Sequence, residues 1–85
     1  MNYTTSDYHL ISFLTAMDVS HVRHYKNGKQ VMFEFDKTDE LLQLIDDYYA
    51  DRVKCSPIRF GNALKQIKAL IYRAPISMDS NGKTE

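Results

Sequence analysis

Residues 57–72 read Pro-Ile-Arg-Phe-Gly-Asn-Ala-Leu-Lys-Gln-Ile-Lys-Ala-Leu-Ile-Tyr, and this stretch decides the fold. Its apolar residues recur at steps of three and four, the spacing of one helix face. They are Ile58, Phe60, Ala63, Leu64, Ile67, Leu70 and Ile71. Ser56 can cap the start with its side-chain oxygen, and Pro57 fits the first turn, where a missing N–H costs nothing. Gly61 costs roughly 1 kcal/mol against alanine inside a helix, so we expect another backbone to approach closely there.

The composition is that of a small folded domain. The 85 residues leave room for one domain, and 44% hydrophobic with 26% charged residues is ordinary for a globular chain. Eleven basic residues balance eleven acidic ones, so only a local patch could attract nucleic acid or a membrane surface. No stretch approaches a membrane span, and residues 1–7 lack the pattern of a secretion signal. We therefore expect a cytoplasmic protein, in which the single cysteine, Cys55, anchors a loop.

Two further helices are expected. The Thr-Thr-Ser-Asp of residues 4–7 is a helix-start cluster, and apolar residues follow at helical spacing up to Met17. This predicts a helix over about residues 6–17 after a loose lead of residues 1–4; which of Thr4, Thr5 and Ser6 caps it stays open. Thr38 begins a second amphipathic pattern over about residues 38–50. The outer face of that helix is acidic and carries Asp39, Glu40, Asp46 and Asp47.

Between these helices lies a predicted β-hairpin. Asn27-Gly28 is the strongest short hairpin signal, because both residues tolerate positive φ. If these two residues form the turn, Lys26 faces Lys29 and Val22 faces Phe33. Alternation then places on the core side Val22, His24, Val31, Phe33 and Phe35. The opposite side carries Val19, His21, Arg23, Tyr25, Met32 and Glu34.

These elements predict an α+β domain over residues 1–73. The expected order is α-β-β-α-α, with one β-hairpin packed on one face by three helices. After Tyr72 the chain is polar, and Pro75 cannot continue a helix. We therefore expect residues 74–85 to form a disordered C-terminal tail.

Four short motifs follow one another along the chain. They are the Thr-Ser-Asp of residues 5–7, the Phe-Glu-Phe of 33–35, the Asp-Asp-Tyr-Tyr of 46–49 and the Leu-Ile-Tyr of 70–72. Together they resemble a family of small, uncharacterised prokaryotic and phage proteins, and the resemblance covers about residues 4–72. It implies a fold-sized unit and a phage or mobile-element setting, and it implies no chemistry.

Residues that could carry catalysis or bind a metal are sparse. His21 and His24 should point to opposite faces of a strand, where they cannot share an ion, and His21 would pair with Glu34 across the hairpin. Asp46 and Asp47 are adjacent on a helix and should diverge by about 100°. No glycine-rich loop is present to cradle a phosphate. We expect no enzymatic activity, metal, cofactor or small-molecule substrate.

A binding role through the hairpin is the first functional prediction. A two-stranded sheet has two open edges and is marginally stable alone. Its second face carries Val19, Arg23, Tyr25 and Met32, which is a composition typical of interfaces. We therefore predict a non-enzymatic interaction module that forms a homodimer or binds a protein partner through this face. Together with the resemblance, such a module would be a phage or mobile-element regulator or inhibitor.

The alternative is a nucleic-acid-binding accessory protein. It would use Lys26 and Lys29 near the hairpin tip and Lys65 and Lys68 on the last helix to contact phosphates. The acidic outer face of residues 38–50 would repel phosphates if it lay near these lysines. Protein binding is therefore the favoured prediction from the sequence.

Overall fold

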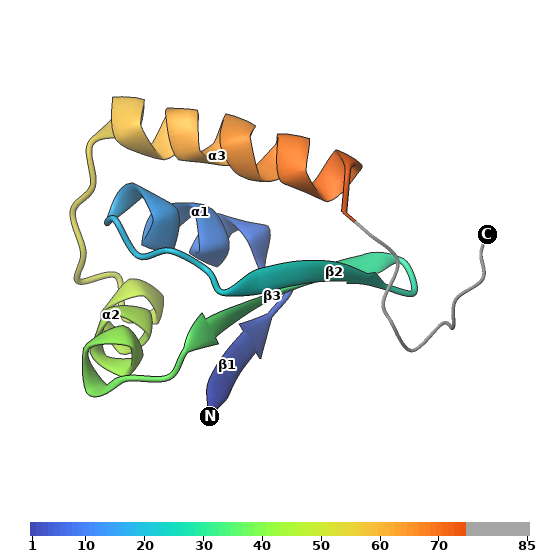
Figure 1. Ribbon diagram of the computed structural model, residues 1–85. Coiled ribbons are helices and arrows are strands. Elements are labelled where there is room, and N and C mark those ends of the chain that lie inside the picture. The colour runs from blue at the N-terminus through green and yellow to red at the C-terminus, as the bar shows by residue number, and fades with distance from the viewer. Residues whose placement is uncertain (75–85) are drawn as a thin grey trace.

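The element order begins with a strand. The computed structural model describes residues 1–74 (Figure 1). Its elements are β1 (Asn2–Thr5), α1 (Tyr8–Ala16), β2 (Arg23–Asn27), β3 (Gln30–Asp36), α2 (Asp39–Tyr49) and α3 (Pro57–Tyr72). The α+β class is confirmed, but the order α-β-β-α-α is wrong at its start, because the expected loose lead is β1. The predicted tail over residues 74–85 lies, apart from Ala74, outside the described residues.

The sheet has three antiparallel strands in the order β1-β3-β2. Tyr3 lies opposite Phe35 and Thr5 opposite Phe33, so β1 covers one edge of the expected hairpin. Tyrosine and threonine favour strands, but four residues show little alternation, and their partner lies far along the chain. The hairpin alone was therefore a wrong description of the sheet, and β3 is its central strand.

The hairpin turn lies one residue further along than predicted. Asn27 pairs with Gln30, and the turn residues are Gly28 and Lys29, with Gly28 at φ 65°. Each cross-strand partner is therefore displaced by two residues, so that His24, rather than Val22, lies opposite Phe33. Because side chains alternate with a period of two, this displacement leaves the residues of β2 and β3 on their predicted faces. Phe33 and Phe35 are fully buried, as predicted.

The alternation was wrong before the start of β2. The strand begins only at Arg23, so residues 19–22 do not follow its pleat. Val22 was placed in the core but is 53% exposed. Val19 was placed on the opposite face but packs against the core cluster. His21 likewise turns toward the core, where its ring lies edge-on to Phe33 with 4.9 Å between centroids.

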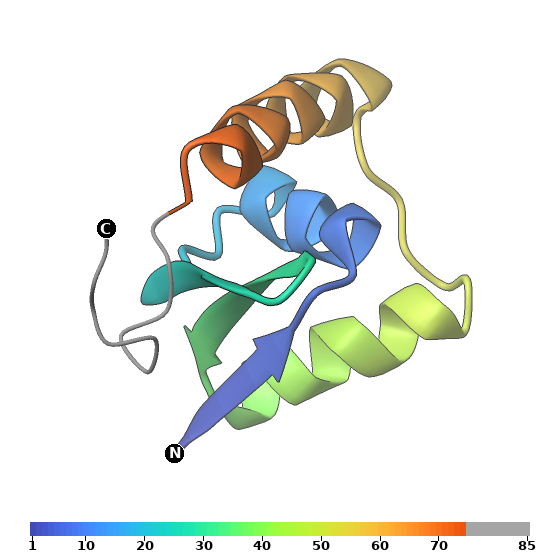
Figure 2. The same cartoon turned by 90° about the vertical axis from the view of Figure 1, so that its right-hand side faces the viewer.

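The core lies between α1 and the sheet and extends to α2 and α3 (Figure 2). In both views α1 lies between α3 and the sheet, so α3 is an outer layer at this point. The cluster of buried side chains consists of Leu10, Ile11, Phe13, Leu14, Phe33, Phe35, Leu41, Ile45 and Ile67. Every described element except β2 contributes to this cluster or packs against it through a partly buried apolar side chain.

The third helix has its predicted bounds. Ser56 caps it, with its Oγ accepting a hydrogen bond from the Arg59 amide at 3.3 Å, and Pro57 occupies the first turn. Two predictions about its interior are wrong. Ile58 is 75% exposed, because the first turn extends past the core. Among the described residues, a Cβ added at Gly61 would meet nothing within 4 Å, so the backbone expected to approach it is not found there.

The other two helix starts are held by a carboxylate and a hydroxyl. Asp7, and none of the three residues considered, is the N-cap of α1, with its Oδ1 accepting from the Leu10 amide at 3.2 Å. Thr38 caps α2 in the same way through Leu41, at 3.0 Å. The Tyr49 hydroxyl at the end of α2 donates to Asp7 Oδ2 at 2.8 Å, and this bond raises the pKa of Tyr49 to about 12. Asp7 therefore joins the start of α1 to the end of α2.

Candidate functional site

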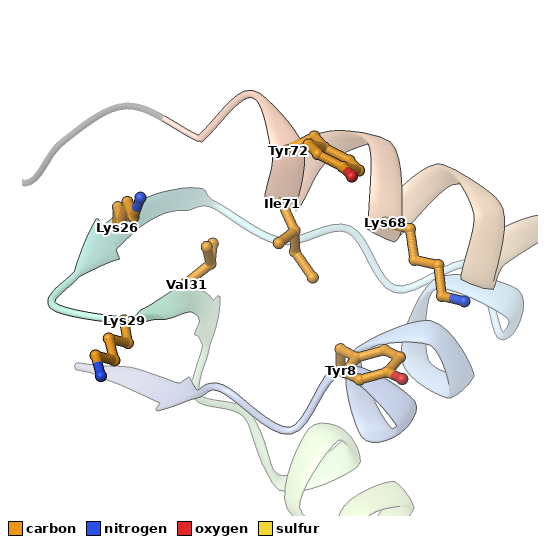
Figure 3. A pocket seen from close by; sticks show the side chains of 7 residues that line it. All are labelled: Tyr8, Lys26, Lys29, Val31, Lys68, Ile71 and Tyr72. Atoms are coloured by element: carbon orange, nitrogen blue, oxygen red, sulfur yellow. The ribbon is translucent and has the colours of Figure 1, made fainter.

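A hollow of about 480 Å³ lies between the hairpin tip and the C-terminal half of α3 (Figure 3). We call it the basic groove. Its lining residues are Tyr8, Lys26, Lys29, Val31, Lys68, Ile71 and Tyr72. The volume falls in the range typical of small-ligand sites. The start of α1, the tip of the β2–β3 hairpin and one face of α3 therefore contribute to one concave surface.

Local structure explains why these residues line one hollow. Lys68, Ile71 and Tyr72 stand at positions i, i+3 and i+4 of α3 and share one helix face. Lys26 and Val31 are cross-strand partners on the side of the sheet that also carries Phe33. Lys29 is a turn residue, and Tyr8 is the first residue of α1. The groove is thus assembled from one helix face, one hairpin tip and one helix start.

Charge and apolar surface are separated within the groove. Figure 3 shows Lys26 and Lys29 at the hairpin end and Lys68 near Tyr8 at the other end, with Val31 and Ile71 between them. None of the lining residues within residues 1–74 is acidic. Tyr72 is 93% exposed and Tyr8 is 36% exposed, so both rings are accessible. The arrangement suits an anionic ligand that also has an apolar or aromatic part.

Three of the four lysines proposed from the sequence therefore line one hollow, two at its hairpin end and one at the other end. Lys65, one turn before Lys68 on α3, is exposed and does not line the groove. Sequence reasoning did not identify Tyr8, Val31, Ile71 or Tyr72 as groove residues. The helical spacing between Lys68 and Tyr72 was a usable signal, but nothing in the sequence placed α3 beside the hairpin tip.

The predicted partner interface is brought together in part. Tyr25 and Met32 are cross-strand partners and are half-buried. The Arg23 guanidinium lies 4.8 Å from the Tyr25 ring centroid, and its Nε lies 3.2 Å from Glu34 Oε1. Val19 is separate from this group, because it packs against the core. Glu34 is thus paired with Arg23, and the predicted pairing with His21 is wrong.

The two histidines of this region also meet, contrary to prediction. His21 Nε2 lies 3.0 Å from His24 Nδ1, and the His24 ring stacks on Phe33. Because β2 begins at Arg23, the strand alternation that would separate them does not include His21. Burial, and then the proximity of His24, lower the pKa of His21. Within residues 1–74, no third metal-ligating residue joins them to make a cluster that could hold an ion.

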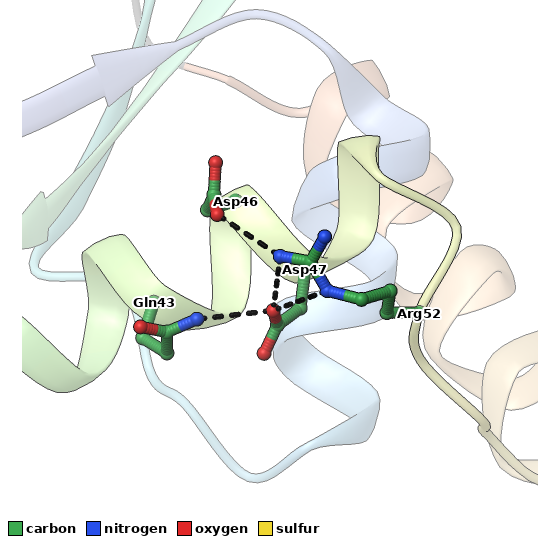
Figure 4. Close-up of polar contacts among 4 residues, drawn as sticks. All are labelled: Gln43, Asp46, Asp47 and Arg52. Carbon is green, nitrogen blue, oxygen red and sulfur yellow. Dashed lines mark hydrogen bonds and ion pairs between the residues drawn. The ribbon is translucent and has the colours of Figure 1, made fainter.

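The acidic residues at the end of α2 converge on one arginine (Figure 4). Arg52 Nη2 lies 2.9 Å from Asp47 Oδ1 and 3.1 Å from Asp46 Oδ2, and Gln43 also donates to Asp47 at 3.0 Å. The prediction that these two carboxylates diverge holds for the helix positions but is wrong for the side chains, which bend toward Arg52. Arg52 therefore partly neutralises the acidic face. Figure 1 shows α2 at the end of the molecule opposite the hairpin tip.

Two other features have a structural explanation. A smaller hollow of about 270 Å³ is lined by Thr15, Asp18, Val19, Ser20, His21 and Gln66. The carboxylate among these described residues, on Asp18, is already paired with Arg59 at 3.1 Å. Cys55 is half-buried against the core, with its Sγ donating to the Ser56 carbonyl at 3.7 Å. This contact fits the loop-anchoring role expected of Cys55.

The fold and the groove define a small α+β domain with a concave, basic and aromatic surface. The family model described as Domain of unknown function (DUF5659) matches residues 1–73, and the chain belongs to this family. No curated protein and no solved structure matches the chain. Among the described residues, no helix is both long and apolar enough to cross a membrane.

Proposed function

We propose that this protein is a non-enzymatic nucleic-acid-binding accessory module and that the basic groove is its binding surface. The observation that carries the proposal is that Lys26, Lys29 and Lys68, from the hairpin and from α3, line one hollow, and that none of its lining residues within residues 1–74 is acidic. A polyanion that spans the groove could contact all three ammonium groups at once. The geometry thus favours the function that the sequence ranked second.

The objection from the sequence was repulsion by the acidic face of α2. That face lies away from the hairpin tip, and Arg52 already binds Asp46 and Asp47. Lysine ammonium groups bind phosphate as compact point charges and carry no base information themselves. Three such contacts would give affinity that falls with salt, with a logarithmic slope of roughly 2 to 3. We therefore expect binding with little sequence preference.

Charge reversal within and outside the groove tests this proposal. The groove variant carries Lys26→Glu, Lys29→Glu and Lys68→Glu. The matched control carries Lys37→Glu, Lys54→Glu and Lys65→Glu, three exposed lysines outside the groove, and so has the same net charge. Fluorescence anisotropy with a labelled oligonucleotide, between about 50 and 200 mM salt, measures the affinity and the salt slope. We expect the groove variant to lose binding and the control to keep most of it; equal losses would refute the groove as the site.

A second candidate is self-association through the edge of the sheet, in line with the protein-binding prediction. Within the described residues, β2 is an outer strand, and Arg23, Tyr25 and Met32 lie together beside this edge. An outer strand offers unpaired backbone groups to a second copy. A cytoplasmic regulator or inhibitor of phage or mobile-element origin would fit either candidate. Sedimentation at micromolar concentration tests the dimer, and a mass near 9.9 kDa would reject it.

A further inference from the structure

We propose that the basic groove selects single-stranded over double-stranded nucleic acid, with Tyr8 and Tyr72 as the residues on which unpaired bases stack. This inference rests on the proposed function and names the class of ligand. It depends on three observations: the concave shape of the groove, its apolar floor between two charged ends, and the accessibility of the two tyrosine rings.

A duplex could not make use of the apolar residues that line the middle of the groove. Val31 and Ile71 line the middle of a hollow of about 480 Å³, between its charged ends, and we call them its apolar floor. A duplex presents phosphates outward and keeps its base faces stacked inside, so it would leave these apolar side chains without a partner. A single strand can turn an unpaired base into the hollow while its phosphates remain outside. The volume suits one such unit and not the body of a helix.

The ammonium groups are placed to bind phosphates on both sides of that base. Lys26 and Lys29 stand at the hairpin end of the floor, and Lys68 stands at the other end (Figure 3). A strand that crosses the floor would therefore pass one ammonium group before the inserted base and another after it. Positive charge that follows the backbone, together with aromatic side chains, is the usual design of single-strand binding surfaces.

Tyr8 has one ring face available for stacking. His9 stacks on Tyr8 with 4.4 Å between ring centroids and 26° between planes. Because His9 covers one face of the ring, only the opposite face and the ring edge can meet a ligand. Tyr8 lines the groove, so a base stacked there would extend a Tyr8–His9 pair that already exists.

Tyr72 stands at the opposite rim. It is 93% exposed and one helical turn after Lys68, so its ring and that ammonium group lie on the same face of α3. Such exposure of a large aromatic side chain gives the fold little stability, and the ring can be changed without opening the core. A base on Tyr72 and a phosphate on Lys68 would be neighbouring contacts of one strand.

An acidic peptide could also supply negative charge with apolar side chains. Carboxylates are recognised best by the two parallel donors of arginine, whereas lysine remains a common partner of phosphate. Within residues 1–74, the cations that line the groove are three lysines. The groove chemistry therefore favours a phosphate backbone over a peptide.

The experiment compares three labelled probes with the full-length chain. They are a short oligothymidylate, a duplex with the same number of phosphates, and a polyglutamate of equal charge. Anisotropy titrations at low salt are repeated with Tyr72→Leu and Tyr8→Leu, which remove the ring and keep most of the apolar volume. Tyr49→Leu is the aromatic control outside the groove, and thermal melts verify that each variant is folded.

We expect oligothymidylate to bind at least roughly tenfold more tightly than the duplex, and each groove tyrosine variant to lower single-strand affinity by roughly tenfold. Duplex affinity should be unchanged in these variants, and Tyr49→Leu should match the parent. Equal affinity for single strand and duplex, or single-strand affinity that is insensitive to both tyrosines, overturns this inference while leaving the proposed function standing. Polyglutamate binding as tight as that of oligothymidylate, or no binding of either nucleic acid, overturns both.

Discussion

The two ends of the β2–β3 hairpin differ in what covers them. At the end far from the turn, which we call the buried end (residues 21–24 and 33–36), Phe33 and Phe35 are fully buried and two histidines pack over them. At the turn end, residues 26–31, the lysines are exposed and Val31 is only half-buried. The same two strands thus supply core packing at one end and an accessible concave surface at the other. We conclude that stability and binding should be separable by mutation.

The largest change in stability is expected at the buried end of the hairpin. Phe33→Ala removes a fully buried ring from the central strand and should destabilise the domain by about 3–5 kcal/mol. Lys29→Ala at the turn end is the control, and it should change the free energy of unfolding by no more than about 0.5 kcal/mol. Denaturant melts measure both. A loss below about 1 kcal/mol for Phe33→Ala would contradict the core assignment.

Asp7→Ala tests whether the stability of the domain also depends on a single carboxylate that joins two helices. Loss of the α1 cap should cost about 0.5–2 kcal/mol, and the Tyr49 hydroxyl would lose its partner as well. Ser6→Ala is the matched control, because Ser6 was a candidate cap and is not the observed one. If Ser6→Ala proved the more damaging substitution in urea melts, the assignment of Asp7 as the cap would be wrong.

Gly61→Ala should change stability in the opposite direction. A Cβ at this position meets nothing within 4 Å, so alanine adds helix propensity without a clash. We expect a gain of about 0.5–1 kcal/mol. Calorimetry would show this as a higher melting temperature. A lower melting temperature would mean that something packs against Gly61 after all.

The smallest effect is the pH dependence of stability that arises from His21 at the buried end of the hairpin. The pKa of His21 is lowered from its ordinary value of 6.5 by burial and by His24, so the unfolded chain binds this proton more tightly than the folded one. Stability should therefore be full above that value and should decrease as the pH falls through it. His21→Gln should flatten the pH dependence between neutral and mildly acidic melts. An unchanged dependence in this variant would assign it to other groups.

Much of the fold could be predicted, because the decisive signals were local. The bounds of α3, its Ser56 cap and the burial of Ala63 and Ile67 follow from periodicity and capping chemistry. The burial of Phe33 and Phe35 survived a misplaced turn, since a displacement of two residues preserves the faces of a strand. The sequence predictions failed at the N-terminal strand β1 and in the residues just before β2. β1 lacked a visible partner, and residues 19–22 were treated as strand although β2 begins at Arg23.

The sequence by itself determined the α+β class, the helix faces and the residues that could supply positive charge. Only the tertiary structure decided that Lys68 lines one groove with Lys26 and Lys29, that Lys65 does not, and that the acidic face of α2 lies elsewhere. The physical reason is the distance along the chain over which each kind of signal acts. Periodicity and capping act within a few residues, whereas the groove depends on how α3 lies against α1 and the sheet. That placement comes from burying Ile67 in a core shared by distant elements, and no local pattern encodes it.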